Sequence, residues 1–377
     1  MLMVAASLAI FVYGMIASML GTVLHNLSER FKLTPSQNGT VALAQALGLI
    51  LASLSVGPLL DNEGKKVGLI LGLTVICFVL FLLPRSSGFR GILILLFALG
   101  IGGGIVVTAA NALVSDVGEA HRATALNLAN LFFGLGGFAT PFIAANFFGK
   151  NWVRLCYTIA SLAVIALAIQ AVIQMPPPVK ADRFVLAEAI PVLGHPLLFL
   201  LAFFLFLYIT CEVGIWNWLP RHLIAQGFSE SRALNILSVG FALGLLIGRM
   251  AVLPVLAHVP PVTVTLVGSM AMAVTTFLMI RGKQPTAVLA LVFLAGLALA
   301  PVFPTTIAIV GNAFPRMTGT AIGFVITCGW AGLAVSSRVI GLIAGGDPRR
   351  LKTALMVIPA SSVMMVGLDL AIRSLLR

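Results

Sequence analysis

The stretch VGLILGLTVICFVLFLLP, residues 67–84, is apolar throughout and holds no charged side chain in eighteen residues. A helix that crosses a bilayer needs about 20 mostly apolar residues. The character of the chain changes at both ends, where Lys65 and Lys66 precede the stretch and Arg85 follows it. Basic residues at the ends of an apolar run are typical of a spanning helix, because their side chains reach lipid phosphates. Residues 67–84 therefore predict a transmembrane helix.

The rest of the chain repeats this pattern with little between the repeats. Of its 377 residues, 60% are hydrophobic and 9% are charged, whereas about a quarter of the residues in a soluble domain are charged. A water-soluble fold has no place for so much apolar surface. The other apolar stretches are 3–27, 36–60, 91–114, 123–149, 152–175, 194–219, 232–256, 261–280, 286–314, 318–344 and 353–375. The sequence predicts an all-α integral membrane protein with twelve transmembrane helices.

Composition also excludes several classes of function. The net charge of +12 does not indicate nucleic acid as a partner, because Lys and Arg gather at the ends of the stretches and form no basic stripe among aromatics. The four cysteines lie singly in four different stretches, so neither a metal site nor a disulfide framework is expected. We find no nucleophile–base constellation and no Walker sequence. We therefore expect neither an enzyme nor an ATP-driven pump, and no cofactor.

Residues 176–193 divide the chain into two halves. They begin with three prolines, carry several charges and follow the sixth stretch. Small residues and threonines at 102–111 in the fourth stretch have weak counterparts at 296–306 in the tenth. Repeated halves are typical of secondary transporters, whose site lies between them near the membrane midplane. We predict two pseudo-symmetric six-helix bundles around a central cavity, in 1–175 and 194–377, joined by a cytoplasmic linker in 176–193.

The connection between the second and third stretches carries a specific motif. It reads GPLLDNEGKKV at 57–67 and resembles the G-x-L-x-D-R-x-G-R-K signature of the major facilitator superfamily, with Asn62 in place of the usual arginine. In that family the loop is cytoplasmic and its acidic residue, here Asp61, pairs with a neighbouring helix end to hold the inner side shut. Gly64 permits a tight turn. The gating residues that the resemblance implies are Asp61, Gly64, Lys65, Arg122 and Arg249.

Further segments resemble the fucose permease and fucose–proton symporter-like branch of this superfamily. They lie in both halves and include residues 108–114, 126–130, 208–219, 247–249 and 301–304. The positions at which that branch carries acidic residues in its first and fourth spans hold Gly21 and Val107 here. The resemblance implies a carrier that works by alternating access on a sugar or a related polyol.

The motif and the distribution of charge favour opposite orientations. The motif implies an inside N-terminus, which leaves eight Lys and Arg residues on the cytoplasmic side and thirteen on the outer side. This distribution is the reverse of the positive-inside rule. Because the motif is the more specific signal, we keep the N-terminus inside and predict a multi-pass protein of a plasma membrane, the bacterial inner membrane.

Glu212 is the one acidic residue that lies well inside a predicted span. A carboxylate in hydrocarbon costs several kcal/mol unless it is paired or protonated, which makes it a candidate for proton coupling. The alternative is a structural carboxylate bonded to a helix break at Gly214. Asp369 lies near the end of the last stretch, four residues before Arg373, so we expect an interfacial ion pair there.

Aromatic rings and amides complete the candidate binding site. Trp216 and Trp330 suit the apolar faces of a sugar ring and Asn217 suits its hydroxyls, although tryptophan near a span end also forms interfacial belts. Asn127 and Asn130 share one helical face, and each buried amide can instead bond to a neighbouring helix. The candidate substrate-binding residues are Gln45, Asn111, Asn127, Asn130, Glu212, Trp216, Asn217 and Trp330.

Two arginines lie within predicted spans. Arg249, near the inner end of the eighth span, is interpreted as a gating or structural residue. Arg338 lies toward the outer end of the eleventh span, and we favour a side chain that snorkels to the interface. Binding of an anionic substrate and pairing with Glu212 are its alternatives.

These patterns together predict a secondary active transporter that takes up a sugar or related polyol with protons. A proton-coupled exporter of drugs or amphipathic metabolites is the alternative, favoured by the single membrane carboxylate and the many Met and Phe residues. A non-transporting sensor on the same scaffold is a third hypothesis. The expected partners are a small-molecule substrate, the proton and membrane lipid, and we expect a monomer.

Overall fold

A computed structural model describes residues 1–33, 35–118, 121–149, 151–175, 191–315, 318–345 and 348–376. The helices are α1 (Leu2–Phe31), α2 (Pro35–Glu63), α3 (Lys65–Leu82), η1 (Leu83–Arg85), α4 (Phe89–Val117), α5 (Arg122–Ile143), η3 (Ala144–Phe148), α6 (Trp152–Val172), α8 (Pro196–Ala225), α9 (Glu230–Asn235), η4 (Ile236–Ala242), α10 (Leu243–Leu256), α11 (Pro261–Arg281), α12 (Pro285–Leu299), α13 (Val302–Ala313), α14 (Thr318–Ala344), α15 (Pro348–Ala354) and α16 (Val357–Leu375). The described part of the chain contains no strand, so the all-α prediction is confirmed.

Twelve of the helical segments in the described residues are long and apolar enough to cross a membrane. They correspond one to one with the predicted stretches, and the main difference is the end of the seventh. That span runs to Ala225 rather than residue 219, because α8 continues through Pro220. A proline near a helix end removes one backbone hydrogen bond and leaves the earlier turns intact.

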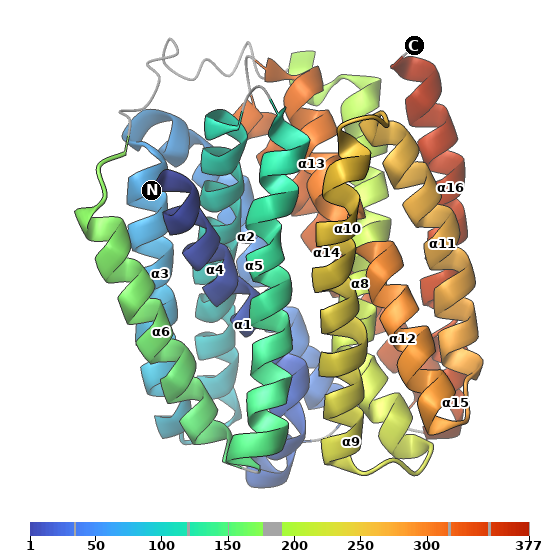
Figure 1. Cartoon of the computed structure of the whole chain (residues 1–377). Helices are drawn as coiled ribbons and strands as arrows, with labels where there is room; N and C mark the ends of the chain where they lie inside the picture. Colours follow the sequence, from blue (N-terminus) through green and yellow to red (C-terminus); the bar gives the residue numbers. More distant parts are fainter. Residues whose placement is uncertain are drawn as a thin grey trace.

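The two sets of helices lie side by side, α1–α6 on one side and α8–α16 on the other (Figure 1). They meet where α2 packs against α14 and where α5 packs against α10 and α13. Both termini lie toward the same end of the bundle, as an even number of crossings requires. Most of the predicted linker, residues 176–190, lies outside the described residues, and the boundaries 1–175 and 194–377 stay predictions.

Glycine lets α2 and α4 approach closely along their length. A Cβ atom on Gly100 would overlap the main-chain carbonyl of Gln45, and one on Gly48 would overlap that of Phe97. Helices in lipid associate through such close backbone packing, because the hydrocarbon around them provides no hydrophobic drive. This packing fixes the face of α2 that carries Gln45 toward the middle of the molecule.

Candidate functional site

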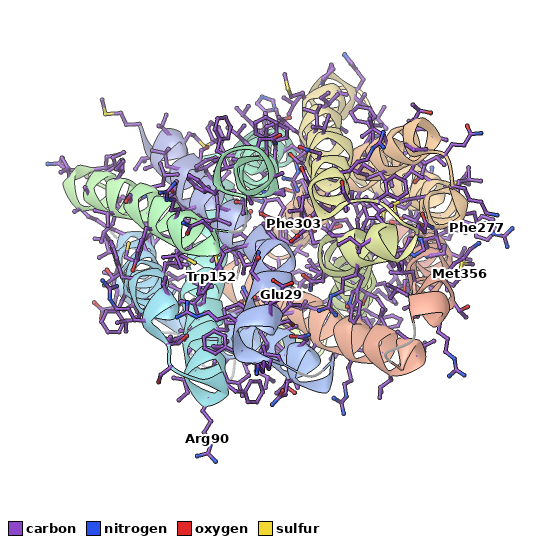
Figure 2. The ribbon with its side chains drawn as sticks, turned by 90° about the horizontal axis from the view of Figure 1, so that it is seen from below. Glu29, Arg90, Trp152, Phe277, Phe303 and Met356 are labelled. Atoms are coloured by element: carbon purple, nitrogen blue, oxygen red, sulfur yellow. The ribbon has the colours of Figure 1, made fainter. Side chains whose placement is uncertain are left out.

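A cavity lies between the two sets of helices. Helices from both sets line it, and most of its wall is apolar or aromatic. Phe303 of α13, one of the lining residues, lies near the centre of the molecule when it is viewed end-on (Figure 2). The polar and charged lining residues are Gln45, Asn130, Glu212, Asn217 and Arg249. A largely apolar pocket with a few polar groups is the usual form of a small-molecule site.

Glu212 lies on α8 and faces this cavity, with only 4% of the residue exposed. The helix runs without interruption through Gly214, so the alternative of a carboxylate bonded to a helix break is wrong. Its Oε1 atom is buried and forms no hydrogen bond of ordinary geometry among the described residues. A buried acceptor without a partner is costly, and a proton or a ligand donor would relieve that cost.

Potential donors stand around this carboxylate. Tyr208, Trp216 and Arg249 are the groups that interact with it most directly. The Tyr208 hydroxyl and the Trp216 indole N–H are themselves buried, and neither forms a hydrogen bond of ordinary geometry with the residues that the structure describes. Of these groups, Glu212, Trp216 and Arg249 line the cavity, so a buried acceptor and two kinds of donor face the space in which a polar ligand would bind.

Arg249 of α10 is 1% exposed and lines the same cavity. Its Nε donates to the Ala300 carbonyl at 3.3 Å, and its Nη1 donates to the carbonyl of Asn130 in α5. Ala300 lacks its usual helical donor because the residue four places on is Pro304, which has no N–H. The guanidinium also lies 5.0 Å from the centre of the Phe133 ring, a favourable cation–π arrangement.

The position of Arg249 differs from the expectation of a residue at the inner end of its span. It lies on the wall of the central cavity and connects α10 to α5. A gating role is compatible with this connection and stays a prediction. The Arg249 guanidinium also places a positive charge on the cavity wall, where a bound solute would lie close to it.

Most of the predicted binding residues are brought together. Those that line the cavity are Gln45, Asn130, Glu212, Trp216, Asn217 and Trp330. Trp330 donates from its indole N–H to the hydroxyl of Ser53 in α2 at 3.1 Å, a bond that joins α14 to α2. A role of these residues in substrate binding remains a proposal.

Asn111 and Asn127 are not among the residues that line this cavity. The Asn111 side-chain oxygen accepts a hydrogen bond from Asn130 at 3.1 Å. Asn127 donates to the hydroxyl of Thr305 in α13 at 3.3 Å. The contacts of both amides are therefore of the kind that the neighbouring-helix alternative describes.

Tyr13 and Tyr208 are site residues that the sequence analysis did not single out. Tyr13 lines the cavity from α1 and its ring lies 6.1 Å from that of Trp330, in an edge-on arrangement. The chain has three tyrosines, and these two lie in the middle of apolar stretches. A phenol in such a place usually finds a polar partner, and that was the signal available.

Asp369 corrects a second expectation. It is 1% exposed and accepts hydrogen bonds from the hydroxyls of Thr265 and Ser269 on α11, at 2.8 and 2.9 Å. The predicted interfacial pair with Arg373 is therefore wrong, because a neighbouring helix supplies donors that no spacing along α16 reveals. Arg338 is exposed on α14, as a snorkelling side chain requires.

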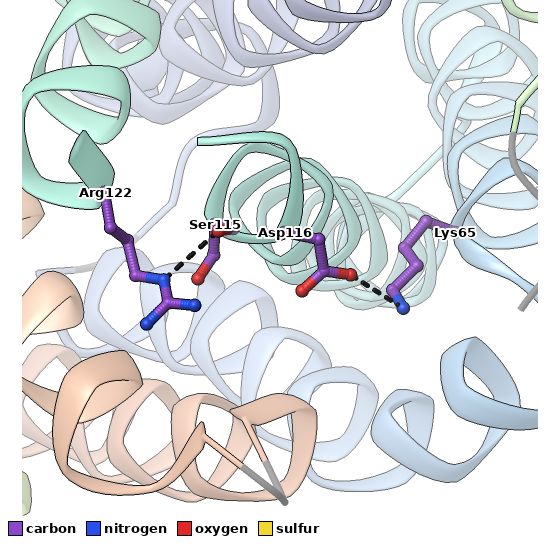
Figure 3. A network of polar contacts seen from close by, with 4 residues as sticks. All are labelled: Lys65, Ser115, Asp116 and Arg122. Carbon is purple, nitrogen blue, oxygen red and sulfur yellow. Dashed lines mark hydrogen bonds and ion pairs between the residues drawn. The ribbon is translucent and has the colours of Figure 1, made fainter. Parts of the chain in front are cut away.

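The predicted inner gate is partly described. Gly64 joins α2 to α3 with a φ of 91°, a conformation that favours glycine, and the expected tight turn is confirmed. Lys65 pairs with Asp116 of α4 at 2.9 Å (Figure 3). The side chain of Asp61 lies outside the described residues.

Arg122 begins α5 and reaches across to the other set of helices. Its Nε donates to the Ser115 carbonyl (Figure 3) and its Nη1 to the side chain of Asn312 in α13, both at 3.1 Å. Together with the bond between Asn127 and Thr305, this contact holds α5 against α13 at the end of the bundle where α5 begins.

In the described residues, twelve helices long enough to span a membrane surround a cavity with a buried carboxylate, an arrangement typical of a membrane transporter. Residues 6–337 match the Major Facilitator Superfamily, and the chain belongs to this family. It is 24% identical over 345 residues to the gentisate transporter of Corynebacterium glutamicum, covering 86% of this chain and 76% of that protein. It is 23% identical over 377 residues to the glucose/mannose transporter of Bacillus subtilis, covering 96% and 92%.

Among solved structures, the chain resembles the fucose:proton symporter FucP of Escherichia coli in its outward conformation. The TM-score is 0.78 at 17% identity, with 98% of each chain covered. This likeness concerns the fold, whereas the family match over residues 6–337 confirms the expected superfamily, and the protein is a multi-pass membrane transporter of that family.

Proposed function

We propose that this protein couples the movement of a small organic solute to protons by alternating access, with Glu212 as the proton-carrying residue. The observation that carries the proposal is the buried Glu212 carboxylate, which faces the central cavity and whose Oε1 forms no hydrogen bond of ordinary geometry in the described part of the chain. Such a group is stable in either of two ways, with a proton or beside a ligand donor. Access that alternates lets it gain the proton on one side and lose it on the other.

The solute would bind between the two sets of helices. Gln45 and Asn130 contribute from α2 and α5, while Asn217 and Trp330 contribute from α8 and α14. A ligand that contacts both sets draws them together only through its different affinity for the open and closed states. We propose that Asp61, Gly64, Lys65, Arg122 and Arg249 close the inner side, with the N-terminus in the cytoplasm of a bacterial cell.

Two substrate classes have support. A sugar or related polyol is favoured by the amides and tryptophans of the cavity and by the similarity to a glucose/mannose transporter. An aromatic acid is favoured by Arg249 among aromatic rings and by the similarity to a gentisate transporter. Proton coupling through Glu212 is common to both.

The test uses purified protein in liposomes, with D-glucose and gentisate as separate labelled probes. Counterflow of a probe needs binding and reorientation but no proton gradient, whereas accumulation needs coupling. Wild type should accumulate one probe when the pH gradient is directed inward. Glu212→Gln should keep counterflow and lose accumulation by at least tenfold. Equal accumulation by wild type and variant would refute the role of Glu212, and probe movement driven only outward would favour the exporter.

A further inference from the structure

The two ends of this transporter differ sharply in charge. With the N-terminus inside, the outer loops and span ends carry thirteen Lys and Arg residues against three acidic ones, Glu29, Glu230 and Asp347. The inner side carries eight basic residues against six acidic ones. In this orientation the excess of basic residues lies on the side opposite to the one that the topological rule favours. A strongly positive face does, however, concentrate anions at the mouth of a channel or cavity.

The positive charge continues inward along α8 and α10. A smaller pocket, lined in part by Asn38, Trp218 and Arg221, lies against the central cavity and shares Leu20, Ala42 and Asn217 with it. Arg221 lies over the Trp218 ring at 5.6 Å. It is nine residues beyond Glu212 on α8, about 13.5 Å along the helix. Arg221 thus lines a pocket that adjoins the central cavity, whose wall carries Arg249.

The central cavity supplies both a cation and rings. Arg249 lines it while two of the five N–H donors of its guanidinium bond to main-chain carbonyls. Tyr13, Phe133 and Trp330 surround the same space. A guanidinium recognises carboxylates through paired, charge-assisted hydrogen bonds, and aromatic walls suit a flat ring.

We propose that the solute is a small aromatic carboxylate, which enters past Arg221, binds Arg249 and travels with one proton on Glu212. This inference rests on the proposed function and names its substrate class. The physical reason for coupling is repulsion, because an anion and an ionised Glu212 cannot share one apolar cavity at low cost. Protonation of Glu212 removes the repulsion, so anion and proton bind together and a monoanion crosses without net charge.

Several other titratable groups surround Glu212. Among the described residues they are Tyr13 of α1, Tyr208 and Cys211 of α8, and Arg249 of α10. Phenol and thiol groups stay neutral near pH 7, and the guanidinium stays charged. Glu212 is the one carboxylic acid in this cluster, so the inference assigns the coupled proton to it.

The first experiment measures affinity in detergent by calorimetry. The probes are benzoate, 4-hydroxybenzoate and 3-phenylpropionate, each with its neutral carboxamide, together with D-glucose. At least one acid should bind ten times more tightly than its amide, and its affinity should fall as the pH rises from 6 to 8.5. Glu212→Gln should bind the acid at least as well and without this pH dependence.

Variants of Arg221 and Arg249 test whether these two positive charges act on the anion. Arg249→Gln should lower the affinity for the acid at least tenfold and change the affinity for the amide less than threefold. Arg249→Lys should recover part of the lost affinity for the acid. Arg221→Gln should raise the KM for uptake severalfold at low salt, leave the maximal rate unchanged, and lose its effect at high salt. If no acid binds, or if Arg249→Gln lowers the affinities for the acid and the amide equally, the inference is overturned.

Transport separates this inference from the function on which it rests. In liposomes, acid uptake should respond to a pH gradient and not to a potassium-diffusion potential. Protein-free liposomes give the background from passive acid permeation. If glucose uptake responds to both gradients, the substrate class is wrong while proton coupling stands. If uptake of every probe ignores pH in wild type and Glu212→Gln alike, the proposed function itself fails.

Discussion

Arg249 of α10 donates a hydrogen bond to the main-chain carbonyl of Asn130 in α5, so a charge on the cavity wall also joins the two sets of helices. A change of charge at Arg249 therefore also acts on a contact between the two sets. Charge-assisted hydrogen bonds of this kind contribute about 1.5–3 kcal/mol each. Binding and helix movement are linked here through a single side chain.

Loss of the Arg122 contact should favour the inward-open state. Arg122 bonds to Asn312 at 3.1 Å across the two sets, and loss of about 1.5–3 kcal/mol shifts an equilibrium by roughly tenfold or more. Thr305→Cys, placed in a background without native cysteines, reports opening of the same region. Arg122→Ala should raise its labelling by a membrane-impermeant maleimide from the inner side at least fivefold.

Lys65→Ala tests a weaker member of the proposed gate in the same experiment. The pair between Lys65 and Asp116 is partly exposed and lies within one set of helices, and surface pairs contribute about 0–1 kcal/mol. Labelling should change less than twofold. If the Lys65 variant opens the inner side as much as Arg122→Ala, the seam between α5 and α13 is not what holds that side closed.

The ring of Trp330 should matter more than its hydrogen bond. Its indole N–H bonds to Ser53 at 3.1 Å, while its ring lines the cavity beside Tyr13. Trp330→Phe keeps an aromatic face and should raise KM less than threefold. Trp330→Ala removes the face and should raise KM at least tenfold. Equal effects of the two substitutions would assign the role to the bond with Ser53.

Asp369 should contribute to stability and not to transport. It is buried between α11 and α16 and accepts hydrogen bonds from Thr265 and Ser269, away from the cavity lining. Asp369→Ala should cost about 1–3 kcal/mol and lower the unfolding midpoint in detergent by a few degrees. Asp369→Asn, which can still accept a hydrogen bond, should lose less. A tenfold loss of turnover with an unchanged midpoint would contradict this assignment.

Gly100 should tolerate no side chain. A Cβ atom at Gly100 would overlap the Gln45 carbonyl of α2, so Gly100→Val must force the two helices apart, and overpacking of this kind typically costs about 1–3 kcal/mol. Size-exclusion chromatography should show loss of the monodisperse species. Gly39→Ala, where nothing lies within 4 Å of the added Cβ, is the control and should behave as wild type.

The spans could be predicted because hydrocarbon imposes one rule, an apolar helix of sufficient length. That rule does not predict that a helix continues through a proline such as Pro220. The predicted end of the seventh span therefore lies six residues before the observed end at Ala225. The cavity residues were harder to predict, because a buried amide bonds to a helix or to a ligand with the same chemistry. Asn127 and Asn130 share a face in the sequence, yet only Asn130 is among the residues that line the cavity.

The environments of charged residues were also hard to predict from the sequence. Glu212 stood out because it lies in the middle of an apolar stretch. The environments of Arg249 and Asp369 depend on partners from other helices, Asn130 in one case and Thr265 with Ser269 in the other. Such partners are distant in the sequence, so spacing along one helix predicted neither position correctly.

The most direct test of the account is solute-driven proton movement in liposomes that enclose a pH indicator. D-glucose, 4-hydroxybenzoate and its permanently charged sulfonate analogue are added outside in turn, with protein-free liposomes as background. We predict that at least one solute acidifies the interior through wild type, and that Glu212→Gln abolishes this acidification while it retains counterflow of the same solute. Proton movement through Glu212→Gln at the wild-type rate would contradict the central role of that carboxylate.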